Sequence, residues 1–242
     1  MQRERAIAVL GDHGALLGDL AERVRDLGHR TVRVKTPEEA IDFAYERNVE
    51  YAAAFIEPMG LAYDLTEALY ALRVQAHSPD MDFIATGEEP DAEHCALLRK
   101  AGVTRALWTP IADNVLRFQL NAALSNNHQD FLRCDTRAPV GGQATVTVGG
   151  RRKLVSIYSL SAGGAFLETP RPSMSGAHVE VAFLTPEGEL SFDANVLYTN
   201  VPGNLSQPML PLGMAVRFED VGRTAWDTLR TIVNSHARTL AV

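Results

Sequence analysis

Two arginines, Arg133 and Arg137, stand four residues apart near the middle of the chain and have a spacing that could hold a ligand. The planar guanidinium of arginine donates paired hydrogen bonds to a phosphate or a base edge, and its flat face stacks on a purine. About twenty residues later, the run Ser159–Gly164 adds two hydroxyls and two glycines. Arginines at this spacing also occur by chance and on many helices, so the pair alone is better explained by two solvated side chains.

The net charge of the chain narrows the class of ligand. A formal charge of −7 weighs against general nucleic-acid binding, which needs a basic face to neutralise phosphates. A small anionic ligand is still compatible, because screening limits the reach of distant charge to about 8–10 Å. We therefore expect no DNA binding, and we expect any anionic ligand to be held by a local pair of arginines.

The arginine pair and the serine–glycine run together resemble the signature of PilZ domains, which is RxxxR followed by (Asp/Asn)-x-Ser-x-x-Gly. The run Gly213–Phe218 resembles a late strand of the same family, and the resemblance extends from Phe131 to the end of the chain. It implies cyclic di-GMP as the ligand and no metal or other cofactor. The ligand-binding residues that it implies are Arg133, Arg137, Ser159, Ser161 and Gly164.

These residues have distinct expected roles. The two arginines close over the phosphates and guanines, Ser161 supplies a hydroxyl, and Gly164 lets the backbone approach the ligand closely. Ser159 departs from the family pattern, which has Asp or Asn at this position to reach a guanine edge. Losing one side-chain hydrogen bond weakens binding by about 1–3 kcal/mol. Binding is expected on balance, and loss of binding stays open as the alternative.

The elements that must position these residues change in character along the chain. From Arg137 onward, short segments alternate with period two, and Gly149-Gly150 and Pro186-Glu187-Gly188 mark turns. This pattern predicts a six- to seven-stranded antiparallel β-barrel, closed by a C-terminal helix with an apolar stripe.

The first half instead alternates buried strands with amphipathic helices. Five such strand–helix pairs, from the strand at 6–10 to the helix at 111–126, predict a doubly wound parallel five-stranded sheet covered on both faces. The predicted fold class is therefore α/β followed by β.

The order and length of the first half resemble the receiver domain of bacterial response regulators. That resemblance places Asp12 where the family usually has two acidic residues, and Glu57 at the phosphoacceptor aspartate. Thr86 fits its position, but Thr109 replaces the lysine before Pro110. Magnesium needs several hard oxygen ligands, and the longer Glu57 side chain displaces the nucleophilic oxygen. We predict a degenerate, non-functional receiver site on a scaffold kept for dimerisation or for docking another protein.

Length and composition support two domains without a membrane segment. We expect a receiver-like domain at 1–126, a linker carrying the arginine pair at 127–137 and a barrel at 138–242. Apolar runs reach less than half of the roughly 20 residues that a membrane helix needs. The two cysteines, Cys95 and Cys134, are too few for a disulfide framework or a clustered zinc site. A cytoplasmic protein without membrane insertion is expected.

These observations favour a signalling protein over an enzyme. The chain has no nucleophile elbow, phosphate loop or metal-binding cluster. We predict a cyclic di-GMP-responsive effector that couples ligand binding at the linker to an unidentified partner protein in motility, pili or exopolysaccharide control. The alternative is an adaptor that binds no nucleotide and acts purely through protein interactions.

Overall fold

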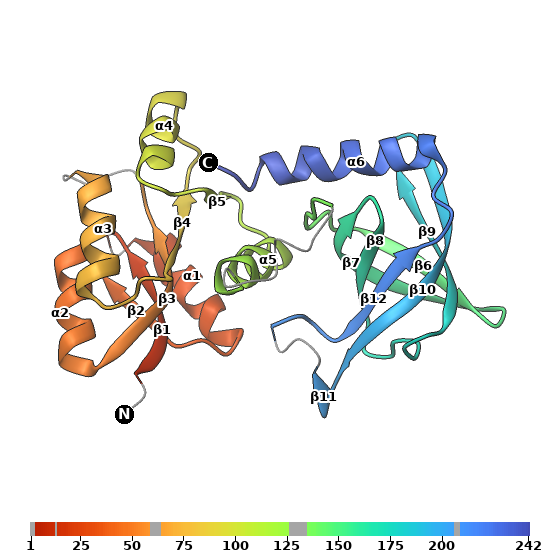
Figure 1. Cartoon of the computed structure of the whole chain (residues 1–242), viewed down its shortest axis with the longest axis horizontal. Coiled ribbons are helices and arrows are strands. Elements are labelled where there is room, and N and C mark those ends of the chain that lie inside the picture. The colour runs from red at the N-terminus through yellow and green to blue at the C-terminus, as the bar shows by residue number, and fades with distance from the viewer. Residues whose placement is uncertain (1–2, 13, 59–63, 126–134, 206–208) are drawn as a thin grey trace. The chain divides into compact units, whose positions relative to one another are not determined.

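A computed structural model of the chain describes residues 3–12, 14–58, 64–125, 135–205 and 209–242. The chain forms two compact units (Figure 1). The N-terminal unit comprises Met1–Phe131 together with Thr239–Val242, and the barrel unit comprises Leu132–Arg238. The sequence-based division had given residues 239–242 to the C-terminal domain. Within the described residues, no helix is long and apolar enough to cross a membrane.

The N-terminal unit is a parallel five-stranded sheet with the order β2-β1-β3-β4-β5. This is the doubly wound order of flavodoxin-like folds, and it confirms the prediction of a receiver-like domain. The strands are β1 (Glu4–Leu10), β2 (Thr31–Val34), β3 (Val49–Ile56), β4 (Asp82–Gly87) and β5 (Arg105–Trp108). The helices are α1 (Ala15–Asp26), α2 (Pro37–Arg47), α3 (Leu65–Gln75), α4 (Ala92–Lys100) and α5 (Asp113–Leu124).

Helices cover both faces of this sheet, as the continuously apolar strands require. Successive residues of β1 point to opposite faces, so Ala8 and Leu10 join one core while Ile7 and Val9 join the other. Helices α2, α3 and α4 contribute to the first core, and α1 and α5 contribute to the second. The two layers are visible on either side of the strands in Figure 1.

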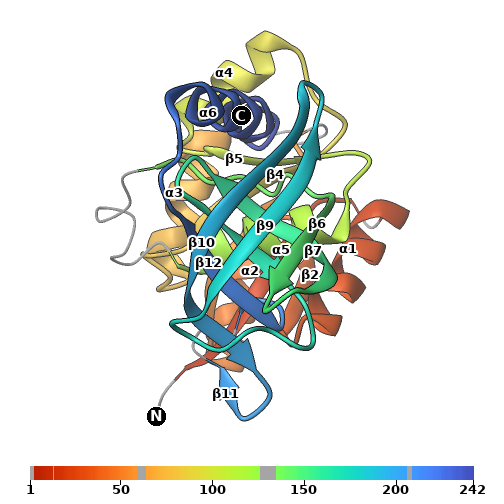
Figure 2. The ribbon, with the colours of Figure 1, turned by 90° about the vertical axis from the view of Figure 1, so that its right-hand side faces the viewer.

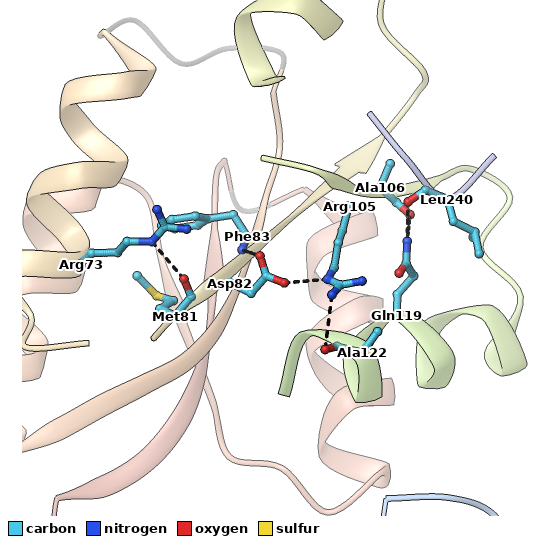
Figure 3. A network of polar contacts seen from close by, with 9 residues as sticks. All are labelled: Arg73, Met81, Asp82, Phe83, Arg105, Ala106, Gln119, Ala122 and Leu240. Carbon is cyan, nitrogen blue, oxygen red and sulfur yellow. Dashed lines mark hydrogen bonds and ion pairs between the residues drawn. The ribbon is translucent and has the colours of Figure 1, made fainter. Parts of the chain in front are cut away.

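The last residues of the chain pair with the edge of the same sheet. Leu240 accepts a backbone hydrogen bond from Ala106 (2.9 Å), and Ala241 forms an antiparallel bridge with Arg105. The buried amide of Gln119 reinforces this pairing, because it donates to the carbonyls of both Ala106 (2.9 Å) and Leu240 (2.6 Å; Figure 3). Val242 adds its side chain to the sheet core. This edge contact explains why residues 239–242 belong to the N-terminal unit.

The barrel unit is antiparallel, and pairing of β9 with β10 closes six of its strands into a barrel (Figure 2). The strand order is β11-β10-β12-β8-β7-β6-β9, so β11 is an additional strand outside the closed ring. The six- to seven-stranded barrel with a C-terminal helix is thereby confirmed. The strands are β6 (Gln143–Val148), β7 (Arg151–Ser161), β8 (Gly164–Glu168), β9 (His178–Thr185), β10 (Gly188–Val201), β11 (Asn204–Leu205) and β12 (Gly213–Phe218).

The helix α6 (Arg223–Arg238) packs on the barrel through its apolar stripe. Leu229 and Val233 are buried in the barrel core, with Trp226 and Ile232 at its margin. The period-two alternation of strands such as β9 sends Val179, Val181 and Phe183 into the same core.

Candidate functional site

The receiver-like residues of the N-terminal unit lie at the carboxyl ends of the strands. Asp12 is exposed, and Glu57 follows β3 in a partly buried position. Burial and then the nearby charge of Asp12 raise the pKa of Glu57 above its ordinary value. Thr86 is fully buried, and its hydroxyl donates to the carbonyl of Leu107 (3.3 Å). In the part of the chain that the structure describes, no group of three or more His, Cys, Asp or Glu side chains could hold a metal.

Thr109 links the carboxyl ends of β4 and β5 through its backbone amide. Its amide donates to the carbonyl of Gly87 (2.8 Å), which joins the ends of β4 and β5. A threonine hydroxyl cannot neutralise an acyl phosphate as a lysine would. The expectation that this site carries out no phosphoryl transfer stays a prediction.

The barrel unit contains an open cavity of about 370 Å³ where the two predicted motifs meet. We call it the ligand cavity. It is lined by Asp135, Arg137, Ser161, Gly163, Leu197, Val216, Arg217 and Phe218.

Backbone pairing brings Arg137 beside the turn between β7 and β8. Ala138, which follows Arg137, exchanges two backbone hydrogen bonds with Leu160 (3.0 and 2.9 Å). Leu160 precedes Ser161, the last residue of β7. The predicted residues Arg137 and Ser161 therefore lie at the same cavity although 24 positions separate their numbers in the sequence.

The turn itself is fixed by hydrogen bonds within the barrel. The hydroxyl of Ser161 donates to the carbonyl of Gly164 (3.1 Å), and the amide of Phe218 donates to the carbonyl of Gly163 (3.0 Å). The first bond holds the turn together, and the second attaches it to β12. The residue Arg217 of that strand thereby lines the same cavity as the turn.

Of the other three predicted ligand residues, Ser159 and Gly164 lie away from the cavity lining. Arg133 lies outside the described residues. Ser159 is 3% exposed within β7 and does not line the cavity. Gly164 packs against β12, since a Cβ on it would lie 2.2 Å from the carbonyl oxygen of Val216. The close approach that the structure shows at Gly164 is therefore between two strands.

Arg217 and Asp135 are cavity residues that the sequence analysis did not single out. Both are exposed and, among the described residues, neither side chain forms a hydrogen bond or ion pair. Arg217 interrupts the otherwise buried run of β12, and that interruption was a usable signal. Asp135 lies inside the RxxxR motif, where its type carried no distinguishing information.

A second cavity of about 310 Å³ shares Asp135 with the ligand cavity. Its other lining residues are Thr136, Ala162, Trp226, Arg230, Val233 and Asn234. The guanidinium of Arg230 lies over the ring of Trp226, 4.9 Å from its centroid. Helix α6 thus supplies an aromatic and cationic surface next to the ligand cavity.

Comparison with known proteins identifies one sequence family in the chain. Residues 131–235 match the sequence model of the PilZ domain. No curated protein sequence matches the chain.

Several solved structures are similar to parts of the chain. A CheY-like response regulator receiver domain protein from Methanospirillum hungatei JF-1 is 18% identical, with a TM-score of 0.42 over 51% of this chain and 94% of that chain. The signal receiver domain of an HD domain-containing protein from Pseudomonas fluorescens Pf-5 is 19% identical, with a TM-score of 0.44 over 55% and 96%. The inhibitor of motility from Bacillus subtilis is 15% identical, with a TM-score of 0.37 over 44% and 52%.

Proposed function

We propose that this chain, which carries a PilZ domain at residues 131–235, is an effector that binds cyclic di-GMP and passes the binding event to a partner protein. PilZ domains are binding modules, so the proposal involves no reaction catalysed by the chain. The observation that supports it most directly is the convergence of Arg137, Ser161 and Arg217 on one open cavity. We place the ligand there, with Arg133 as the other arginine of the pair.

The chemistry of the cavity suits this ligand. Cyclic di-GMP carries two phosphates and two guanines, and guanidinium groups bind both phosphate oxygens and the O6 and N7 acceptors of guanine. Arg137 and Arg217 provide such groups, and Ser161 provides a hydroxyl. Leu197 and Phe218 add apolar surface on which a purine face can lie. Cations and apolar wall together fit a purine nucleotide better than a simple anion.

Ligand binding would act on the segment that joins the two units. The arginine pair belongs to residues 127–137, so a ligand held by both side chains would restrict that segment. The N-terminal unit would then dock a partner protein, or a second copy of the chain, in the control of motility, pili or exopolysaccharide. A cytoplasmic location is part of this proposal.

Calorimetric titration of the full chain with cyclic di-GMP tests the proposal. Arg137→Ala should weaken binding by about 10- to 100-fold, because hydrogen bonds from a charged donor contribute about 1.5–3 kcal/mol. Arg152→Ala is the matched control, since Arg152 is an exposed arginine of β7 that does not line the cavity. Equal affinity of Arg137→Ala and the unaltered chain would rule out the site.

The second candidate function is an adaptor that binds no nucleotide. The burial of Ser159 favours it, because the position where the family carries Asp or Asn offers no side chain to this cavity. In this case the unaltered chain gives no binding heat with cyclic di-GMP. The titration therefore separates the two functions before any variant is made.

A further inference from the structure

Asp135 places a carboxylate in the wall of a cavity proposed for a doubly anionic ligand. It lines both the ligand cavity and the second cavity. Its Oδ2 atom lies 3.1 Å from the place where a Cβ at Gly163 would stand, so the carboxylate reaches over the turn between β7 and β8. Within the described part of the chain it forms no hydrogen bond or ion pair. Among the described residues, no group competes with a ligand for this carboxylate.

A carboxylate at this place opposes phosphate binding, since like charges repel. It favours a ligand group that presents hydrogen-bond donors, because an ionised carboxylate is only an acceptor. Guanine presents two adjacent donors on one edge, the N1–H and the 2-amino group. Adenine places an acceptor at N1 instead, which a carboxylate repels.

We propose that Asp135 is a specificity residue that accepts hydrogen bonds from the N1–H and 2-amino group of one guanine of the ligand. The inference rests on the proposed function. Arg137 and Arg217 would then serve the phosphates and the O6 and N7 acceptors. Asp135 supplies the carboxylate that the chain lacks at Ser159, and it does so from within the arginine motif.

Gly163 is part of the same arrangement. A methyl group there would stand 3.1 Å from Oδ2, so the carboxylate would have to move by a few tenths of an ångström. Gly163 has no positive φ that would itself exclude alanine. Gly163→Ala therefore alters the position of the carboxylate with little other change, which makes it a second probe of Asp135.

The test measures three ligands by calorimetry: cyclic di-GMP, cyclic di-AMP and cyclic di-IMP, which lacks the 2-amino group. Asp135→Ala should bind cyclic di-GMP at least about tenfold more weakly than the unaltered chain, which corresponds to about 1.4 kcal/mol. Its preference for cyclic di-GMP over cyclic di-IMP and cyclic di-AMP should fall by a similar factor. Asp193→Ala, which removes an exposed carboxylate of β10 away from the cavity, should keep the original preference.

The direction in which Asp135→Ala changes the affinity for cyclic di-GMP distinguishes a specificity role from simple repulsion of the phosphates. If Asp135 only repels the phosphates, Asp135→Ala binds cyclic di-GMP as tightly or more tightly and keeps its guanine preference, which overturns the inference while leaving the proposed function intact. If the unaltered chain binds none of the three nucleotides, the proposed function fails and the inference fails with it. Gly163→Ala should weaken cyclic di-GMP binding in the unaltered chain and have no further effect in Asp135→Ala. An equal effect in both backgrounds would count against Asp135.

Discussion

A buried polar pair in the N-terminal unit and the charged side chains of the ligand cavity in the barrel unit serve opposite purposes. In the N-terminal unit, the buried carboxylate of Asp82 accepts from the guanidinium of Arg105 (2.6 Å) and from the amide of Phe83 (2.9 Å; Figure 3). In the barrel unit, the exposed side chains of Asp135 and Arg217 line a cavity and form no hydrogen bond or ion pair with the described residues. The polar groups around Asp82 stabilise the fold, whereas the side chains of Asp135 and Arg217 remain accessible.

This difference follows from burial. A buried polar group without a partner destabilises the fold by about 1–3 kcal/mol, so the buried carboxylate of Asp82 needs partners within the fold. Charged side chains at an open cavity remain solvated at little cost and can exchange water for a ligand. A cavity with unpaired charges of both signs is therefore better evidence for a binding site than a buried network of bonded ones.

Gly164→Ala should produce the largest loss of stability, and it tests whether this glycine serves the fold. Its Cβ would lie 2.2 Å from the carbonyl oxygen of Val216, so β8 and β12 would have to separate. We expect the barrel unit to lose about 2–3 kcal/mol of unfolding free energy. Urea denaturation followed by Trp226 fluorescence measures this loss in a Trp108→Phe background, since the chain has only these two tryptophans.

Gly163→Ala is the matched control for that measurement. Of the described residues, a Cβ on Gly163 would meet only the side-chain oxygen of Asp135, at 3.1 Å, so the stability of the barrel should change little. If Gly164→Ala were as stable as Gly163→Ala and differed from the unaltered chain only in its affinity for cyclic di-GMP, Gly164 would belong to the binding site, as the sequence predicted.

Gln119→Leu should have an intermediate effect that is confined to the N-terminal unit. The variant leaves the carbonyls of Ala106 and Leu240 without their side-chain donor. We expect a loss of about 1–2 kcal/mol of unfolding free energy and an unchanged affinity for cyclic di-GMP. Fluorescence of Trp108 in a Trp226→Phe background reports the unfolding of this unit, and titration in the original background reports the affinity.

Gln75→Leu is the control for this change, because Gln75 is exposed at the end of α3 and makes no hydrogen bond with the described residues. Lower nucleotide affinity in Gln119→Leu alone would contradict the division between the two units. It would mean that the pairing of residues 239–242 with β5 also influences the ligand cavity.

The sequence predicted the fold well because both halves have strong periodicity. The apolar runs of β1 and β3 and the alternation of β9 specify their elements locally, without help from distant residues. The pairing of Leu240 with β5 could not be predicted in this way. Only a few residues at the end of the chain take part, and their partners lie more than a hundred positions earlier.

The candidate site was predictable only where it follows a linear motif. Arg137 and Ser161 belong to such motifs and line the cavity. Asp135 and Arg217 meet there because the segment before β6 pairs with β7 while β12 pairs with β8, and no sequence spacing records that. For Gly164, the sequence motif indicated that a glycine is needed. It could not tell that the group approaching this glycine is the backbone of β12 and not the ligand.

Glu57→Gln should have the smallest effect on stability, and the sign of that effect characterises the receiver-like site. The pKa of Glu57 is raised from 4.5 by burial and by Asp12, so the folded state holds this proton more tightly than the unfolded chain does. Stability is therefore lost as the pH rises from 4.5 through the raised pKa, and it stays lower above that interval.

We expect no structural hydrogen-bonding role for the Glu57 side chain like that of Gln119. Removing the charge of Glu57 should therefore stabilise the fold. Glu57→Gln should gain up to about 1 kcal/mol at pH 7, because solvent screens the partly exposed pair, and nothing at pH 3.5. Glu46→Gln, at an exposed position of α2, should change stability equally little at both pH values. Urea unfolding followed by Trp108 measures both variants. A loss of stability in Glu57→Gln at pH 7 would show that the carboxylate has a favourable partner, and the N-terminal unit would then retain a charged site of its own.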